Sequence, residues 1–260
     1  MRDFTHTAYK QYLEAIKDNI GTFQRFDEYM VASKKPESFC LLRHDVDRKP
    51  HLALKMAKLE HRMGVKATYY FRIKRCSFIP DIIREIADMG HEVGYHYESL
   101  SETNGDINLA IKDFEKNLTT LRKIATVKTC AMHGQPLKPY DNRDIWRIKE
   151  NHEYLQNKLG LLGEVYLDID YTDIAYINDT GRNWTSGKSN VRDKVYSNVK
   201  ADFSSGEELL SYLSNSPHQK ICFQIHPERW NNSTFGWSIQ LMRDTATNSA
   251  KRVLKFLRNK

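Results

Sequence analysis

The segment CLLRHDVDRKP, Cys40–Pro50, passes within a few residues from an apolar strand to the ionisable side chains Arg43, His44, Asp45 and Asp47. Asp45 and Asp47 are two residues apart, so on an extended chain their side chains point to the same side. Two carboxylates held close together favour a bound cation or a shared proton. The alternative interpretation is a strand that ends in solvent with a surface ion pair.

Segments rich in β-branched and aromatic residues alternate with segments of helical period along the rest of the chain. The predicted strands are SFCLLRH (38–44), KATYYFRI (66–73), HEVGYH (91–96), VKTCAMH (127–133), EVYLDID (164–170), IAYIND (174–179) and KICFQIH (220–226). This alternation predicts an α/β fold with a parallel sheet curled into a barrel. In such folds the chemistry collects at the carboxyl ends of the strands.

Helix signals lie between these strands. Pro50 marks a helix start, Gly64 marks its end, and Leu52, Met56, Leu59 and Met63 form its apolar face. The segment IPDIIREIADMG (79–90) repeats this plan. Ser205 and Glu208 have the spacing of a capping box before another helix.

With 260 residues, 40% of them apolar, the chain is long enough to bury a full core, and we expect a single domain over residues 1–260. Its parts are an N-terminal helical extension (1–37), a motif-bearing barrel (38–230) and a C-terminal helix (231–260). The first residues contain no apolar run of signal-peptide or membrane length, which predicts a cytoplasmic protein without a transmembrane segment. The four cysteines are far apart and adjoin apolar segments, so we expect reduced core thiols.

The formal net charge is +7, yet no nucleic-acid-binding motif accompanies it, so we expect no nucleic-acid partner. An anionic substrate, such as a nucleotide-linked or phosphorylated sugar, fits the charge equally well.

Histidine is scarce in this chain, with ten in all, but four predicted strands end on one: His44, His96, His133 and His226. Asp179 ends a fifth strand in the same way. In a parallel sheet these ends meet at one mouth. The sequence therefore predicts a site there.

The segments HDVD, GHEVGYHYESL, CAMHGQP and FQIHPERW occur in an order that resembles the polysaccharide deacetylases of the NodB-homology type, the family-four carbohydrate esterases. The resemblance covers roughly Phe39–Trp230. It implies a distorted seven-stranded (β/α) barrel that uses a divalent metal, most commonly Zn²⁺, to remove acetyl groups from sugars. It further implies that Asp45 is the general base, that Asp47 and His96 bind the metal, and that His226 protonates the leaving group.

The sequence departs from the family at the metal site. The second motif of the family has another histidine four residues after the first, and here that position is Leu100. His133, which stands in place of an arginine of the third motif, is the predicted third ligand, and Glu98 is the alternative. Loss of the metal is a further interpretation, because two protein ligands are too few for a zinc site.

The implied chemistry accounts for these residue types. A catalytic zinc polarises the acetyl carbonyl, and Asp45 takes a proton from the attacking water. His226, with a pKa near its ordinary value, hands a proton to the departing amine. Arg43 is a candidate for orienting Asp45.

Candidate substrate-binding residues stand near the same strand ends: Arg143, Asp179, Trp184 and Trp230. The tryptophans either stack on sugar rings or pack in the interior.

We therefore predict a metal-dependent deacetylase whose substrate is an N-acetylated sugar. A cytoplasmic location makes that sugar an intracellular precursor of a surface polysaccharide, in nucleotide-linked or lipid-linked form. One alternative is an amidase that opens a non-sugar cyclic amide. The other is a non-catalytic glycan- or nucleotide-sugar-binding module, for which Leu100 is the sequence evidence.

Overall fold

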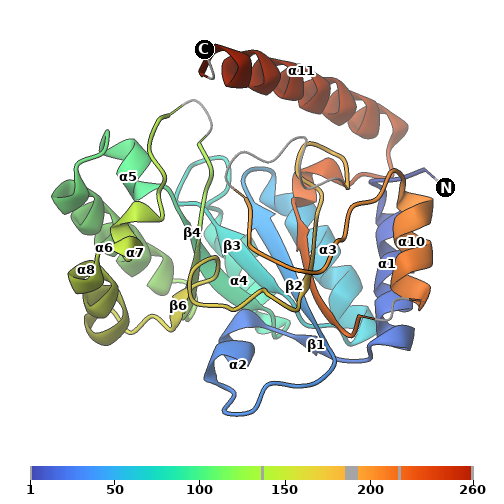
Figure 1. The fold of residues 1–260 in the computed structure, drawn as a ribbon, viewed down its shortest axis with the longest axis horizontal. Helices are drawn as coiled ribbons and strands as arrows, with labels where there is room; N and C mark the ends of the chain where they lie inside the picture. Colours follow the sequence, from blue (N-terminus) through green and yellow to red (C-terminus); the bar gives the residue numbers. More distant parts are fainter. Residues whose placement is uncertain (1, 136–137, 185–192, 216–217, 259–260) are drawn as a thin grey trace.

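The computed structural model describes residues 2–258 apart from 136–137, 185–192 and 216–217, and for 250–258 it describes the backbone alone. Its centre is a parallel sheet with the strand order β6-β5-β4-β3-β2-β8-β7, and β1 pairs with β2 outside this path (Figure 1). The strands are β1 Phe23–Gln24, β2 Phe39–Val46, β3 Thr68–Phe71, β4 Glu92–Tyr97, β5 Thr129–Met132, β6 Gly163–Glu164, β7 Ala175–Asn178 and β8 Lys220–Ile225.

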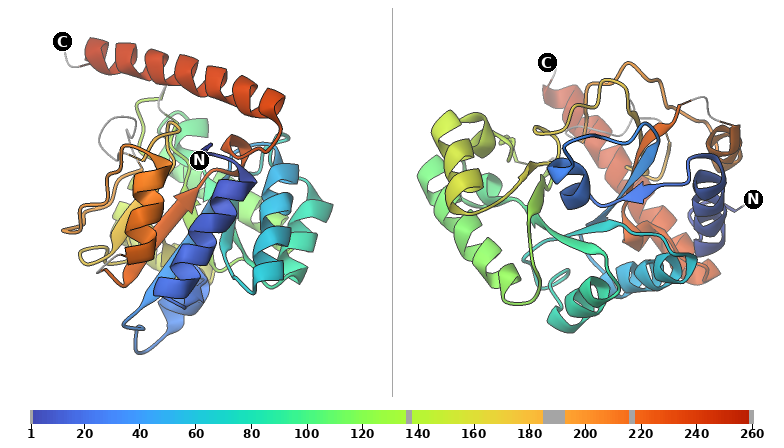
Figure 2. Two further views of the ribbon diagram at one scale, coloured as in Figure 1. Left: turned by 90° about the vertical axis from the view of Figure 1, so that its right-hand side faces the viewer. Right: turned by 90° about the horizontal axis from the view of Figure 1, so that it is seen from below.

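Helices surround the outside of the curled sheet, as the view along the barrel shows (Figure 2). The helical elements are α1 His6–Asn19, α2 Phe26–Val31, α3 Pro50–Met63, α4 Pro80–Asp88, α5 Ser99–Glu102, α6 Ile107–Arg122, α7 Asp144–Arg147, α8 Lys149–Glu153, a π-helical turn Tyr154–Lys158, α10 Gly206–Asn215, a 3₁₀ turn Pro227–Arg229 and α11 Thr234–Arg258. No helix among the residues described is long and apolar enough to cross a bilayer.

The predicted fold class is confirmed: the seven strands of the main path form a distorted (β/α) barrel that curls without closing. β2 is an interior strand of the sheet, and all of its residues are buried between β3 and β8. Its register pairs Arg43 with Gln224 of β8, and Asp45 with Tyr70 of β3. The segment that ends in Asp45 and Asp47 is therefore the core of the sheet, and its carboxyl end lies at the mouth.

Two strands differ from the sequence prediction. The two-residue strand β1 was not predicted, because so short a segment carries no period. EVYLDID contributes only Glu164 to β6 and then continues as turns. Side-chain carboxylates take over the missing strand contacts, since Glu164 accepts from the backbone N–H of Met132 and Tyr166, and Asp168 accepts from the N–H of Glu164.

The predicted helix signals agree with the structure. α3 begins at Pro50 and ends at Gly64, which has a φ of 70° that glycine adopts without strain. Leu52 and Met56 are buried, and Leu59 and Met63 pack against the core. At α10 the capping differs in detail, because Ser205 Oγ accepts from the N–H of Glu208, whereas the Glu208 carboxylate accepts from Ser204.

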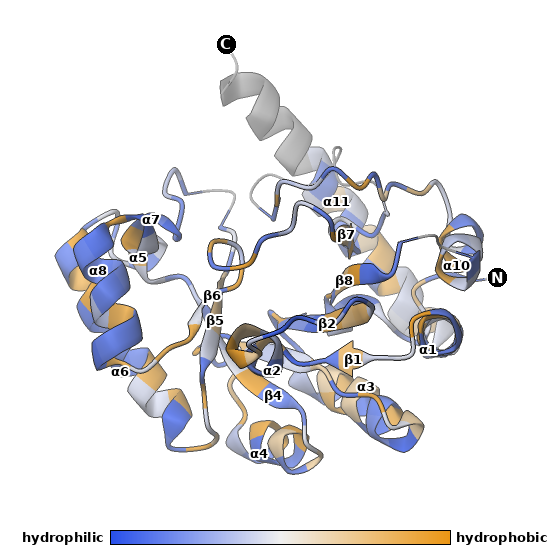
Figure 3. Ribbon diagram, turned by 60° about the horizontal axis from the view of Figure 1, so that its bottom comes forward, coloured by the Kyte–Doolittle hydropathy of each residue, from blue (hydrophilic) through white to orange (hydrophobic). Residues whose placement is uncertain are grey.

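The two ends of the barrel are covered differently. α2 lies over the amino-terminal end (Figure 3), where the N–H groups of Phe26 and Asp27 donate to Thr68 Oγ1 and Glu92 Oε2. α11 runs across the opposite end of the molecule (Figure 1). The carboxyl ends of the strands, where the predicted site lies, are thus on the side of α11.

The cysteines are all free, as predicted. Cys40, Cys130 and Cys222 are buried. The prediction was wrong for Cys76, which is exposed in the loop after β3. Cys76 lies in a turn between β3 and α4, so its neighbouring apolar residues do not place the thiol in the core.

Candidate metal centre

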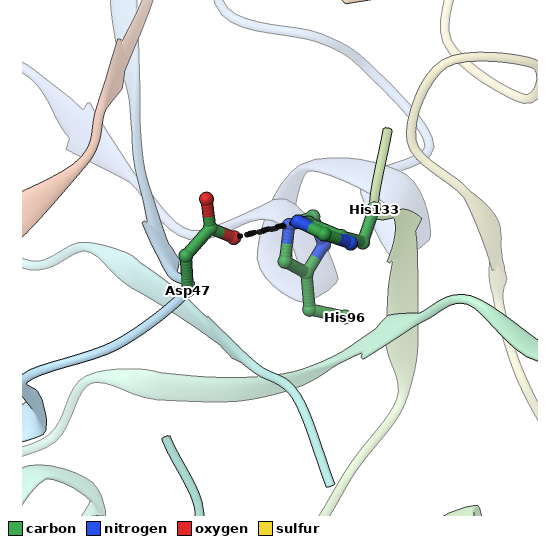
Figure 4. Close-up of side chains that lie close together, drawn as sticks. All are labelled: Asp47, His96 and His133. Atoms are coloured by element: carbon green, nitrogen blue, oxygen red, sulfur yellow. Dashed lines mark ion pairs between the residues drawn. The ribbon is translucent and has the colours of Figure 1, made fainter. Parts of the chain in front are cut away.

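Three predicted metal ligands come together at the carboxyl end of the sheet. Asp47 follows β2, His96 lies on β4, and His133 follows β5. Both imidazole rings face the Asp47 carboxylate (Figure 4), and Asp47 Oδ1 is 3.4 Å from His96 Nε2 and 3.4 Å from His133 Nε2. Their candidate ligand atoms all lie within 4.8 Å of one another.

This arrangement fits a divalent metal ion. Asp47 Oδ1 is buried and accepts no hydrogen bond from the part of the chain that the structure describes. A buried acceptor without a donor is uncommon and requires an explanation. Two ligands on a tetrahedral zinc ion, each at about 2.0–2.1 Å, lie about 3.3–3.4 Å apart. The two separations from Asp47 Oδ1, each 3.4 Å, therefore match those of ligands on a shared ion.

The protonation states are also suited to a cation. His96 Nδ1 lies 2.9 Å from the carbonyl oxygen of Ala131, which only accepts, so this nitrogen carries a hydrogen and Nε2 is the atom left to bind a metal. Burial alone would raise the pKa of Asp47, but His133 and His96 lower it well below its ordinary value. Asp47 is thus an anion.

Asp45 lies beside these residues and is held rigidly. Arg43 donates to it from Nε at 2.7 Å and from Nη2 at 2.9 Å, and Gln224 Nε2 donates at 2.6 Å. Burial raises the pKa of Asp45, but Arg43 and His96 outweigh burial and lower it. The carboxylate is ionised, and its Oδ2 is 3.7 Å from His96 Nε2.

His226 forms a pair with Asp179. Its Nδ1 is 2.6 Å from Asp179 Oδ1, and its backbone N–H donates to Oδ2. Burial and Arg229 lower the pKa of His226, but Asp179 and Asp47 outweigh them and raise it to about 9. The expectation of an ordinary pKa was therefore wrong, and the ring is an imidazolium at neutral pH.

Asp179 serves this pair rather than a substrate. It is fully buried, and besides His226 it accepts from Arg229 Nη1 at 2.9 Å and Trp230 Nε1 at 2.8 Å. These donors use both of its oxygens, which leaves no exposed surface for a sugar. The predicted substrate contact is replaced by a role in holding His226.

The two tryptophans belong to the interior. Trp230 is fully buried, and Trp184, which is 3% exposed, stacks on Phe4 at a centroid distance of 5.2 Å. Trp184 Nε1 also donates to Asp3. Neither ring presents a free face to a sugar, so the packing alternative holds for both.

Arg143 keeps its predicted role as a candidate substrate-binding residue. Arg143 forms a two-point ion pair with Asp141, keeps 13% of its side chain exposed, and lies 5.6 Å from the Tyr166 ring, so it stays a candidate for substrate binding.

His44 does not lie at the mouth with the other histidines that end predicted strands. It is fully buried, with Nε2 2.8 Å from Glu60 Oε1, because the pleat turns it away from its neighbours Arg43 and Asp45.

Gln224 and Glu228 are among the residues at this site that sequence reasoning missed. Gln224 stands two residues before His226, and that same-face spacing was a usable signal. Glu228 is buried without a hydrogen bond to either oxygen among the described residues, and its nearest cation contact is Arg48 Nε at 3.5 Å. Burial and Asp47 raise its pKa to about 7. No sequence pattern marked it.

Comparison with known proteins adds little to this geometry. No protein-family model matches the chain, and no curated protein matches it. Among solved structures, the chain is similar to a mutant of a CE4 family pseudoenzyme with restored enzymatic activity. The TM-score is 0.38 and the sequence identity 12%, over 83% of this chain and 64% of that chain. This protein is thus defined by its own observed features, a curled parallel α/β barrel with a candidate metal centre at the carboxyl end.

Proposed function

We propose that this protein is a metal-dependent hydrolase that removes the acetyl group from an N-acetylated sugar. The observation that carries the proposal is the meeting of Asp47, His96 and His133 at one point, beside an anionic Asp45 and a cationic His226. Binding, general-base and general-acid groups are the parts that hydrolysis of an amide requires. In this proposal His133 takes the third ligand position, in place of the histidine that the family has where this chain has Leu100.

The residues divide the chemistry between them. Asp47, His96 and His133 would hold the metal, for which zinc suits two imidazoles and a carboxylate, and which would act as a Lewis acid on the acetyl carbonyl. Asp45, kept ionised by Arg43, accepts a proton from the attacking water.

His226 has Nδ1 engaged with Asp179, so its available proton is on Nε2. That proton passes to the amine nitrogen as the C–N bond breaks. The acetyl carbon leaves as acetate and the sugar retains a free amine.

The substrate class is part of the same proposal. Arg48 and Lys49 directly follow Asp47. Cations beside the site favour an anionic sugar, such as a nucleotide-linked one, over a neutral one. The cytoplasmic location and the intracellular polysaccharide precursor stay predictions.

The test is acetate release by the purified, zinc-loaded protein from a panel of N-acetylated sugars, free and nucleotide-linked, with cyclic amides in the same panel. We expect release from a sugar, loss of release after chelation, and loss in Asp45→Asn. Asp81→Asn, which changes a carboxylate whose side chain is 93% exposed, is the matched control. Turnover of cyclic amides alone would replace the sugar with a non-sugar amide, and a zinc-loaded protein that turns over neither would contradict an enzymatic function.

A further inference from the structure

Glu98 lies directly after β4 and is 5% exposed, yet its carboxylate is crowded with donors. His133 Nδ1 lies 2.8 Å from Oε2, and Gln135 Nε2 donates to the same oxygen at 2.6 Å. Arg72 Nη2 donates to both oxygens, at 2.9 and 2.8 Å. One buried carboxylate therefore connects the loop after β3, the end of β4 and the loop after β5.

The position of Glu98 relative to His133 shows which role it has. Its oxygen faces Nδ1, whereas the Nε2 atom of the same ring faces Asp47. Glu98 is not in the group whose ligand atoms converge. Arg72 donates to both of its oxygens, so the carboxylate acts as an acceptor. An ionised carboxylate beside Nδ1 places the ring hydrogen there, and Nε2 is left with its lone pair.

We propose that Glu98 is a positioning residue, which fixes the tautomer and the orientation of His133 so that Nε2 is presented to the metal. The proposal rests on the metal site of the proposed function. The ligand at the third position is then His133, and Glu98 acts through it rather than on the ion. A carboxylate on the far nitrogen of a ligating histidine also makes that histidine a stronger ligand.

Arg72 extends the same unit to a second ligand. Its Nη2 binds Glu98 while its Nη1 lies 3.3 Å from the backbone carbonyl of Asp47. Glu98 thereby sets the separation between the ends of β2 and β5, on which Asp47 and His133 stand. Loss of Glu98 should disturb both ligands, whereas loss of a surface acid nearby should disturb neither.

The test compares zinc affinity in Glu98→Gln and Glu98→Ala, measured by competition with a chelator of known affinity. Loss of such an outer hydrogen-bond partner weakens metal binding about 10–100-fold, and we expect Glu98→Ala to lose more than Glu98→Gln, whose amide oxygen still accepts from Nδ1. Glu85→Gln is the control, since this half-exposed acid of α4 pairs with Lys58 at 2.7 Å and should leave the affinity unchanged. Circular dichroism identifies any variant that does not fold.

A second readout is independent of the metal. In the metal-free protein the ¹⁵N chemical shifts of His133 report its tautomer, and we expect Nδ1–H in the parent and a mixture in Glu98→Ala. Unchanged zinc affinity in both variants overturns the proposal, as does an Nε2–H tautomer in the parent. Retention of zinc by His133→Ala with its loss in Glu98→Ala would make Glu98 the ligand and also overturn it. A parent protein that binds no zinc but shows Nδ1–H would contradict the proposed function, and it would support only the part of the proposal in which Glu98 fixes the tautomer of His133.

Discussion

Three of the site residues at the mouth are each held by a hydrogen bond to a buried partner. Asp45 is held by Arg43, His226 by Asp179, and His96 by a backbone carbonyl. Each partner is buried, so the interactions act where water screens them little. The consequence is a set of defined protonation states, which single substitutions can test.

Replacing Asp47 or His96 with Ala should remove the metal. Because a ligand is lost, the affinity for zinc should fall by more than the about 10–100-fold expected for loss of an outer partner. Zinc affinity in the parent should also fall as the pH decreases, because an imidazole must be neutral to bind the metal. Asp45 and Asp47 raise the pKa of His96 against the effect of burial, so His96 takes up a proton at a higher pH than an ordinary histidine. Equilibrium competition at several pH values measures both effects, and far-UV circular dichroism checks the fold. Full zinc occupancy in either variant would contradict the assignment.

The pair of His226 and Asp179 predicts the alkaline limb of the rate profile. His226 donates only while protonated, so kcat/KM should fall as the pH rises through about 9. Asp179→Asn removes the negative charge that raises this pKa, so the limb should move to lower pH by about 1–3 units. His226→Ala should lower kcat/KM by about 10²–10⁴-fold and flatten the limb. The profiles are measured on a sugar that the parent turns over, with Asp81→Asn as control. An alkaline limb that persists unchanged in His226→Ala would show that His226 is not the acid.

At the scale of elements, strand ends carry the site, and the edge of the sheet shows how side chains replace strand pairing. β6 has only Gly163 and Glu164, and the Glu164 carboxylate accepts from the N–H groups of Met132 and Tyr166, each at 2.8 Å. These contacts connect β5 to the turn that follows β6. The loop with His133 begins at the same strand, so this edge supports the site.

Glu164→Ala should destabilise the protein. It leaves two buried backbone donors without an acceptor, at a cost of about 1–3 kcal/mol each. Burial raises the pKa of Glu164 to about 7, so the folded state favours the protonated form of this carboxyl group. The stability that Glu164 contributes to the parent is therefore partly lost as the pH rises from the ordinary pKa of a glutamate to about 7. Urea unfolding at pH 5.5 and pH 8 therefore should show the larger difference at the lower pH. Glu153→Ala, at an acid whose side chain is 61% exposed, is the control, and equal losses in the two variants would count against the role of Glu164.

On the scale of the whole molecule, both terminal segments are joined to the barrel. Tyr9 of α1 is fully buried and donates to Glu60 of α3 at 2.6 Å. Asp244 of α11 lies 3.7 Å from Arg229, which in turn binds Asp179. The segments outside the motif-bearing region therefore contribute to the core and to the surroundings of His226.

We accordingly expect one cooperative unfolding transition in calorimetry, as for a single domain. Deletion of residues 2–20 should abolish it, because α1 and its buried tyrosines are removed from the core. Near-UV circular dichroism of the truncated chain checks the loss of fixed aromatic packing. Two separate transitions in the parent, or a truncated chain with a native spectrum, would contradict the single domain.

Local patterns in the sequence were enough for the barrel and for part of the site. Runs rich in β-branched and aromatic residues marked the strands, and Pro50 and Gly64 marked α3, because these features act through the backbone of a few neighbouring residues. The two-residue spacing of Asp45 and Asp47 was visible in the same way. The same two-residue period places Arg43 and Asp45 on one face of β2 and His44 on the other. It was therefore enough to predict that His44 faces away from the mouth.

Only the tertiary structure decided which residues meet across the strands. His133 turns Nε2 towards Asp47 while Glu98 takes its other nitrogen, and Trp184 and Trp230 pack inward instead of facing the mouth. These positions follow strand ends and turns, where the strand period no longer sets the direction of a side chain. Their partners lie up to 181 residues away in sequence, as for Trp184 and Asp3. Contacts of this kind depend on the register of the whole sheet, which no local pattern contains.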